Sequence, residues 1–123
     1  MSPAATTLRG RSSLTELTLL WYGLAAGAGW WAVHLVALAA LVPAACGRPW
    51  VLWLMHGATL VCAAGTVAAI ASAARLRRPG RRRATAVDVE RDRFLGRLGQ
   101  LIGVASLALI LLEDLPVWFV APC

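Results

Sequence analysis

Two long stretches without a single Asp, Glu, Lys or Arg constrain this chain more than any other feature. They cover residues 17–42 and 50–74, and a shorter stretch of the same kind covers residues 98–112. Apolar runs of about 18 or more residues are typical of membrane-spanning helices. The pattern predicts an all-α, three-span transmembrane bundle with spans at about 17–42, 50–74 and 94–115. It excludes a soluble enzyme, a nucleic-acid-binding domain and a disordered tail as descriptions of the whole chain.

The remaining segments are short and polar. Residues 1–13 are predicted to form a polar N-terminal tail, and residues 14–123 a single membrane domain. Within that domain we expect an Arg-rich cytoplasmic loop at 75–93 and an outer interfacial tail at 116–123. The chain as a whole is therefore predicted to be one compact domain in contact with the lipid bilayer.

Prolines are expected to set two of the helix ends, because proline lacks the N–H that continues a helix. Pro43, Gly47 and Pro49 predict a tight outer turn between the first two spans. A loop that short makes the two spans antiparallel neighbours. Pro116 is expected to end the third helix, and the aromatic tail after it to lie along the outer interface.

Positive charge is strongly segregated along the chain. All 12 basic residues are Arg, the net charge is +6, and Arg48 alone lies between the first two spans. The positive-inside bias predicts a cytoplasmic N-terminus and Arg-rich loop, with the C-terminus outside. An all-Arg, Ala-rich composition is typical of a GC-rich bacterial genome, so we expect the membrane to be a bacterial cytoplasmic (inner) membrane. Anionic lipid headgroups are a better partner for the Arg cluster than nucleic acid, because no aromatic residues interleave with it.

His34 and His56 are the ionisable residues of the first two spans. They lie about 12 and 9 Å below the outer ends of their helices at about 1.5 Å per residue, in the same leaflet, where the two imidazoles could approach each other. Ionisable groups in a membrane are costly and mark candidate functional sites. The pair could ligate a metal such as copper, ligate haem, or contact a cofactor of a partner protein. Alternatively each imidazole is structural, bonded to a backbone carbonyl or to Trp30, Trp31 or Thr59.

Two adjacent carboxylates, Glu113 and Asp114, fall in the outer leaflet of the third span. Neighbouring helical residues point about 100° apart, so one could reach His34 or His56 and the other the headgroups. A His–carboxylate pair could relay protons or orient a metal ligand. It could equally serve only to neutralise a buried charge.

Three cysteines divide between the outer side and the membrane. Cys46 and Cys123 are both expected outside, where a disulfide persists, and are therefore candidates for one disulfide. The same two thiolates could instead take up Cu(I), because soft sulfur ligands suit that ion. Cys62 falls near the middle of the second span and is expected to behave as a small buried hydrophobe.

Small residues at helical spacing mark the packing faces. Gly23 and Gly27 form one GxxxG motif, and Gly99 and Gly103 form another. Such pairs let helix backbones approach closely. They predict helix packing, either within this chain or onto a larger membrane partner.

Several short motifs follow one another along the chain in a characteristic order and spacing. They are Trp31-x2-His34-Leu35, Pro43-x2-Cys46, Leu54-x-His56-x2-Thr59, Arg93-Phe94-Leu95-x3-Gly99, Pro116 and Pro122-Cys123. Together, over about residues 30–123, the chain resembles small, uncharacterised bacterial three-helix membrane proteins encoded near cytochrome c oxidase subunit and assembly genes. The resemblance implies an association with the aerobic terminal oxidase, but it implies no known activity. His34, Cys46, His56 and Cys123 match its polar signature.

Three functional hypotheses follow. The first is a non-catalytic accessory subunit or assembly factor of a respiratory terminal oxidase, docked through its glycine faces. The second is a copper- or haem-handling protein that uses His34 and His56, with or without Cys46 and Cys123. The third is a structural membrane protein without a cofactor, and no cofactor is the leading expectation. Because the chain contains no HExxH, CxxC, Walker or GxSxG motif, we do not expect an enzyme.

Overall fold

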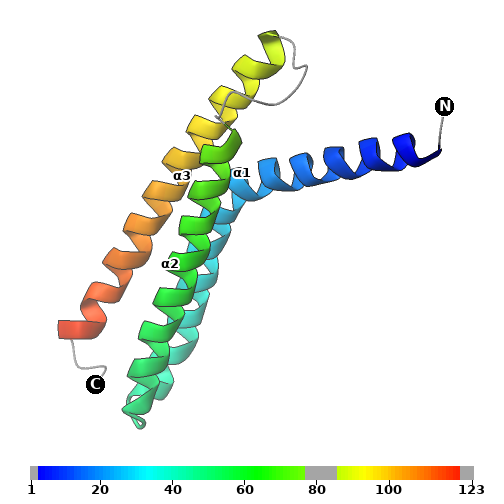
Figure 1. Cartoon of the computed structure of the whole chain (residues 1–123). Coiled ribbons are helices and arrows are strands. Elements are labelled where there is room, and N and C mark those ends of the chain that lie inside the picture. Colours follow the sequence, from blue (N-terminus) through cyan, green and yellow to red (C-terminus); the bar gives the residue numbers. More distant parts are fainter. Residues whose placement is uncertain (1–2, 77–85, 120–123) are drawn as a thin grey trace.

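The protein is a bundle of three long helices. The computed structural model describes residues 3–76 and 86–119, which form α1 (Pro3–Ala45), α2 (Trp50–Leu76) and α3 (Ala86–Phe119). α2 and α3 lie alongside the C-terminal part of α1, and each helix contacts the other two (Figure 1).

Each helix contains a segment long and apolar enough to cross a membrane. These segments are Leu17–Ala45, Trp50–Arg75 and Val89–Phe119, of 29, 26 and 31 residues. The predicted all-α, three-span architecture is therefore confirmed, and the orientation of the bundle in the membrane stays a prediction. Because the third segment includes Glu113 and Asp114, both carboxylates lie within the length of a span.

The expectation that Pro43 and Pro116 end their helices is wrong. α1 continues through Pro43 to Ala45, and α3 continues through Pro116 to Phe119. Each proline lies in the last turn, where its missing N–H removes a single intrahelical hydrogen bond and leaves the rest of the helix intact. The outer turn is consequently shorter than expected, and covers only residues 46–49.

The segments predicted as tail and loop are partly helical. Residues 3–13 belong to α1 instead of forming a separate tail, and this first part of the helix turns away from the bundle (Figure 1). Within α1, the Thr18 hydroxyl donates to the Leu14 carbonyl oxygen at 2.8 Å, a type of bond that often bends helices. The Arg-rich loop is shortened from both sides, because α2 reaches Leu76 and α3 starts at Ala86.

The two GxxxG motifs lie where the helices come closest. A Cβ added at Gly99 would lie 2.5 Å from the Gly23 carbonyl oxygen, and one at Gly27 would lie 3.0 Å from the Gly103 Cα. The glycines of α1 and α3 therefore pack against each other within this chain. The hypothesis that these faces dock a partner does not hold, because neighbouring helices of the same chain already cover them.

A second close contact joins α1 and α2 through Gly65. The Trp30 indole occupies the space that a side chain at Gly65 would fill. The Trp30 Nε1–H donates to the Tyr22 hydroxyl at 3.3 Å, and that hydroxyl donates to the Gly65 carbonyl oxygen, also at 3.3 Å. Tyr22 thus joins the two helices by hydrogen bonds.

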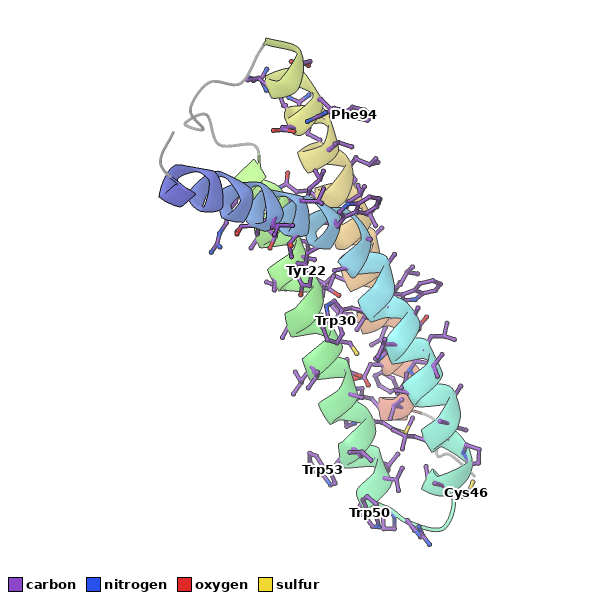
Figure 2. All side chains as sticks on the ribbon, turned by 90° about the vertical axis from the view of Figure 1, so that its right-hand side faces the viewer. Tyr22, Trp30, Cys46, Trp50, Trp53 and Phe94 are labelled. Carbon is purple, nitrogen blue, oxygen red and sulfur yellow. The ribbon has the colours of Figure 1, made fainter. Side chains whose placement is uncertain are left out.

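The surface of each helix that faces away from the other two helices is apolar and exposed. Figure 2 shows Cys46, Trp50 and Trp53 at one end of the bundle and Phe94 at the other. Trp53 is 77% exposed and Leu60 is 72% exposed. Such a surface suits lipid chains or a membrane partner far better than water.

Candidate functional site: a histidine–carboxylate network

A polar network lies inside the bundle, in the half that contains the outer turn. α1 contributes His34, α2 contributes His56 and Thr59, and α3 contributes Glu113 and Asp114. His34 is fully buried and Thr59 is 5% exposed. The structure therefore brings together both predicted histidines and both predicted carboxylates, on three different helices.

His34 uses both of its ring nitrogens. Nδ1 lies 3.0 Å from the Glu113 Oε2, and Nε2 lies 2.9 Å from the Thr59 Oγ1. The other carboxylate oxygen of Glu113 accepts the Trp31 Nε1–H at 2.9 Å. Glu113 is therefore held by two α1 side chains that lie about one helical turn apart.

His56 forms the second pair. Its Nδ1 lies 3.1 Å from the Asp114 Oδ2, which also accepts the Trp118 Nε1–H at 3.1 Å. The Trp118 ring lies against the imidazole, with 4.5 Å between ring centroids, and Trp53 approaches it edge-on at 6.4 Å. The side chain of His56 is 21% exposed and that of Asp114 is 14% exposed, whereas in the first pair His34 is fully buried and the Glu113 side chain is 28% exposed. His56 therefore lies nearer the bundle surface than His34 does.

Thr59 connects the two pairs. Its Oγ1 lies 2.9 Å from the Asp114 Oδ1, in addition to its contact with His34. The imidazoles, which were predicted to approach each other, are therefore joined indirectly, through one hydroxyl and one carboxylate. The prediction that one carboxylate reaches the headgroups is wrong, because Glu113 and Asp114 each bind a histidine.

Two ionised carboxylates in an apolar span are costly unless opposite charge accompanies them. Protonation of His34 and His56 would make the cluster neutral. No buried side-chain nitrogen or oxygen in the described part of the chain lacks a hydrogen-bond partner. The site is therefore a closed network whose members satisfy one another.

The geometry disfavours the predicted metal and haem sites. A ligating imidazole needs an unprotonated nitrogen facing the metal, and both nitrogens of His34 are engaged by side chains. Residues 3–76 and 86–119 contain no group of three His, Cys, Asp or Glu side chains arranged to hold a metal ion.

Of the three cysteines, the structure describes Cys46 and Cys62. Cys46 is disulfide-bonded, which leaves it no thiolate for Cu(I). Cys62 is a free thiol and is 3% exposed, in keeping with a small buried hydrophobe. Cys123 lies outside the described residues, so the pairing of Cys46 with Cys123 stays a prediction.

Two features of the network were not predicted. Trp118 was assigned to an interfacial tail, because Pro116 was expected to end the helix, although its spacing of four residues from Asp114 is a helical contact distance. Thr59 was expected at most as a partner for an imidazole, and its bond to Asp114 depends on how α2 and α3 pack.

The chain matches no protein-family model, no curated protein and no solved structure. Four ionisable side chains and one hydroxyl, held inside three apolar helices, can exchange and store protons or hold the helices in register.

Proposed function

We propose that this chain is a non-catalytic integral membrane accessory subunit or assembly factor of an aerobic respiratory terminal oxidase in a bacterial cytoplasmic membrane. The observation that supports it is the convergence of His34 and His56 on adjacent carboxylates of α3. These histidines carry the polar part of the resemblance to proteins encoded near oxidase genes. Residues that are dispersed in the sequence thus contribute to one site, as expected if the resemblance reflects a common role.

The contacts within the network support a non-catalytic role. Both nitrogens of His34 and both oxygens of Glu113 and Asp114 already contact side chains of this chain. A nucleophile or general base needs an atom within reach of a substrate. Partner contact in this proposal involves the exposed apolar surface, since the glycine faces are covered.

The proposed orientation places the N-terminus and the Arg-rich end in the cytoplasm. Arg75, Arg91, Arg93 and Arg97 lie at the end of α2 and the start of α3, and the outer turn with Cys46 lies at the opposite end. Segregation of Arg to one end of a bundle supports this orientation through the positive-inside bias.

Co-purification from the native host tests the proposal. The chain is tagged at its N-terminus and extracted in mild detergent, and the eluate is examined by mass spectrometry beside that of an equally abundant, unrelated three-span protein carrying the same tag. Stoichiometric oxidase core subunits, absent from the control, support an accessory subunit. Substoichiometric oxidase or copper chaperones support an assembly factor, and a solitary chain overturns the proposal.

The same eluate tests whether the chain handles a metal or haem. Copper is measured by elemental analysis and haem by its absorbance, in the native chain and in a His34→Ala/His56→Ala variant. Copper or haem that is present at stoichiometric level and lost in the variant would replace the accessory proposal by a cofactor-handling one.

A further inference from the structure

The Thr59 hydroxyl has one hydrogen but three polar neighbours. Its Oγ1 lies 2.9 Å from the His34 Nε2, 2.9 Å from the Asp114 Oδ1 and 3.1 Å from the Met55 carbonyl oxygen. A hydroxyl donates one hydrogen bond and accepts up to two. When the hydroxyl hydrogen points to a side chain, and not to the Met55 carbonyl, Thr59 donates to one of the two side-chain neighbours and accepts from the other.

This condition places one additional proton in the network. If His34 is protonated on both nitrogens, it donates to Glu113 and to Thr59, and Thr59 donates to Asp114. If His34 carries a hydrogen on Nδ1 alone, Thr59 must donate to Nε2, and Asp114 must then be protonated to donate to Thr59. If His34 carries a hydrogen on Nε2 alone, Glu113 must be protonated to donate to Nδ1. Each arrangement holds one proton more than neutral imidazoles with ionised carboxylates.

We infer that Thr59 joins the two His–carboxylate pairs into a single proton relay, which carries a proton between the buried His34 and the partly exposed His56. In the first step the His34 Nε2–H bond breaks and its proton bonds to the Thr59 Oγ1. The hydrogen of the Thr59 hydroxyl moves at the same time to the Asp114 Oδ1. His34 loses its positive charge, the Asp114 carboxylate loses its negative charge, and Thr59 ends as it began.

In the second step the proton passes from Asp114 to the Nδ1 of His56, which lies 3.2 and 3.1 Å from the two carboxylate oxygens. For this step His56 begins neutral, with its hydrogen on Nε2. The imidazolium that forms is stabilised by the Asp114 carboxylate and by the face of Trp118, at 4.5 Å between ring centroids. His56 is the exchange point of the proposed relay, because its side chain is 21% exposed and it lies nearer the end of its helix than the fully buried His34 does.

Few other charges can disturb the relay. Within residues 3–76 and 86–119, the titratable groups that face it are His34 from α1, His56 from α2, and Glu113 and Asp114 from α3. The sequence has no other Asp, Glu, Lys or Arg in residues 17–45, 50–74 or 98–112. Charges in such an apolar setting interact more strongly than in water, so protonation of one member changes the proton affinity of the next.

The relay occupies only the half of the bundle that contains the outer turn. It therefore exchanges a proton between the bundle interior and one membrane surface and does not carry protons across the membrane. The inference does not depend on the identity of a partner, and the purified chain alone tests it.

Nuclear magnetic resonance of ¹⁵N-labelled histidine, with the full chain in lipid nanodiscs, tests the relay over a range of pH. Interacting sites release protons in shared macroscopic steps. We therefore expect His34 and His56 of the native chain to report the same two steps. Thr59→Val keeps the shape of the side chain and removes the hydroxyl. Each histidine should then titrate together with its own carboxylate alone, in steps that the other histidine does not share.

Two controls separate the relay from general effects of packing. Thr66→Val removes a buried hydroxyl two turns further along α2, which among the described residues bonds to the Cys62 carbonyl oxygen alone, and it should leave the shared steps intact. Thr59→Ser keeps the hydroxyl and should restore the shared steps. If Thr59→Val does not fold, Asp114→Asn serves in its place, because an amide cannot carry the relayed proton.

Independent single-site titration of His34 and His56 in the native chain overturns the inference. So does a shared titration that persists unchanged in Thr59→Val or in Asp114→Asn. The co-purification experiment can fail while this one succeeds, so the two proposals are judged separately.

Discussion

Glu113 and Asp114 are neighbours in the sequence, yet their carboxylates bind histidines on two different helices. The Glu113 Oε2 lies 3.0 Å from the His34 Nδ1 on α1, and the Asp114 Oδ2 lies 3.1 Å from the His56 Nδ1 on α2. Successive residues of a helix point about 100° apart, so two adjacent side chains of α3 can face two different helices. One turn of α3 thereby fixes the rotation of all three helices about their axes.

The two histidines should differ in their contribution to stability. His34 is fully buried, and His34→Ala leaves the Glu113 carboxylate without its histidine partner and the buried Thr59 without one hydrogen bond. Loss of one partner of a buried pair costs about 3 kcal/mol or more of unfolding free energy. His56→Ala removes a more exposed partner, and Asp114 keeps its bonds from Thr59 and Trp118, so a loss of about 1 kcal/mol is expected.

Denaturant titration of both variants in mixed detergent–lipid micelles measures this difference. Phe94→Ala, which truncates an exposed side chain at the far end of the bundle, is the control and should change stability little. Equal losses for His34→Ala and His56→Ala would contradict the different burial of the two sites.

Gly99 should tolerate no side chain. A Cβ there would lie 2.5 Å from the Gly23 carbonyl oxygen, which is backbone and cannot move aside without separating α1 from α3. We expect Gly99→Ala to destabilise the bundle by about 2 kcal/mol, in the range of overpacked cores. The change in unfolding free energy is measured by the same denaturant titration.

Gly57→Ala is the matched control for Gly99→Ala. Gly57 lies within α2, and a Cβ there would meet nothing within 4 Å. Replacement of glycine by alanine inside a helix is favourable by about 0.5–1 kcal/mol. A Gly99→Ala variant as stable as the native chain would contradict the close approach of α1 and α3. An equal loss of stability in Gly57→Ala would show that the effect of Gly99→Ala is not specific to that contact.

Labelling of free thiols with a maleimide tests the disulfide of Cys46. Because Cys46 is disulfide-bonded and Cys62 is 3% exposed, a membrane-impermeant maleimide should not label either residue in intact cells. The Cys123→Ala variant should expose the Cys46 thiol to the reagent without prior reduction, if Cys123 is the partner as predicted. Unlabelled Cys46 in that variant would show that its partner is another thiol.

The orientation of the bundle follows from its charge segregation. Alkaline phosphatase fused after Cys123 should be active, because the enzyme acquires its disulfides only outside the cytoplasm. A fluorescent reporter of cytoplasmic location, fused at the same place, should be dark. The reverse result would place the Arg-rich end outside, against the positive-inside bias.

The sequence predicted the three spans well because hydropathy is a local, additive property. The second span was expected at 50–74 and the helix runs over Trp50–Leu76. The helix ends at Pro43 and Pro116 were misjudged, since a proline in a last turn costs one hydrogen bond and not the helix. The helical start of α1, before Leu17, carries no apolar signal from which it could have been predicted.

The candidate residues of the site were also evident from the sequence. Ionisable side chains in an apolar span are conspicuous by their cost, and this singled out His34, His56, Glu113 and Asp114. Which carboxylate pairs with which histidine was not evident, because this depends on the rotation of α3 about its own axis. The second bond of Thr59, to Asp114, depends on the same rotation.

The sequence by itself therefore determined that this chain forms three apolar helices, and which polar residues they carry into the membrane. These properties depend on each segment alone, through its length, hydropathy and charge. Only the tertiary structure decided that Glu113 meets His34, that Asp114 meets His56, and that Thr59 joins the two pairs. The close contact of Gly99 with the Gly23 backbone sets how the helices are rotated and spaced, and a change of one residue in that register turns a side chain by about 100°.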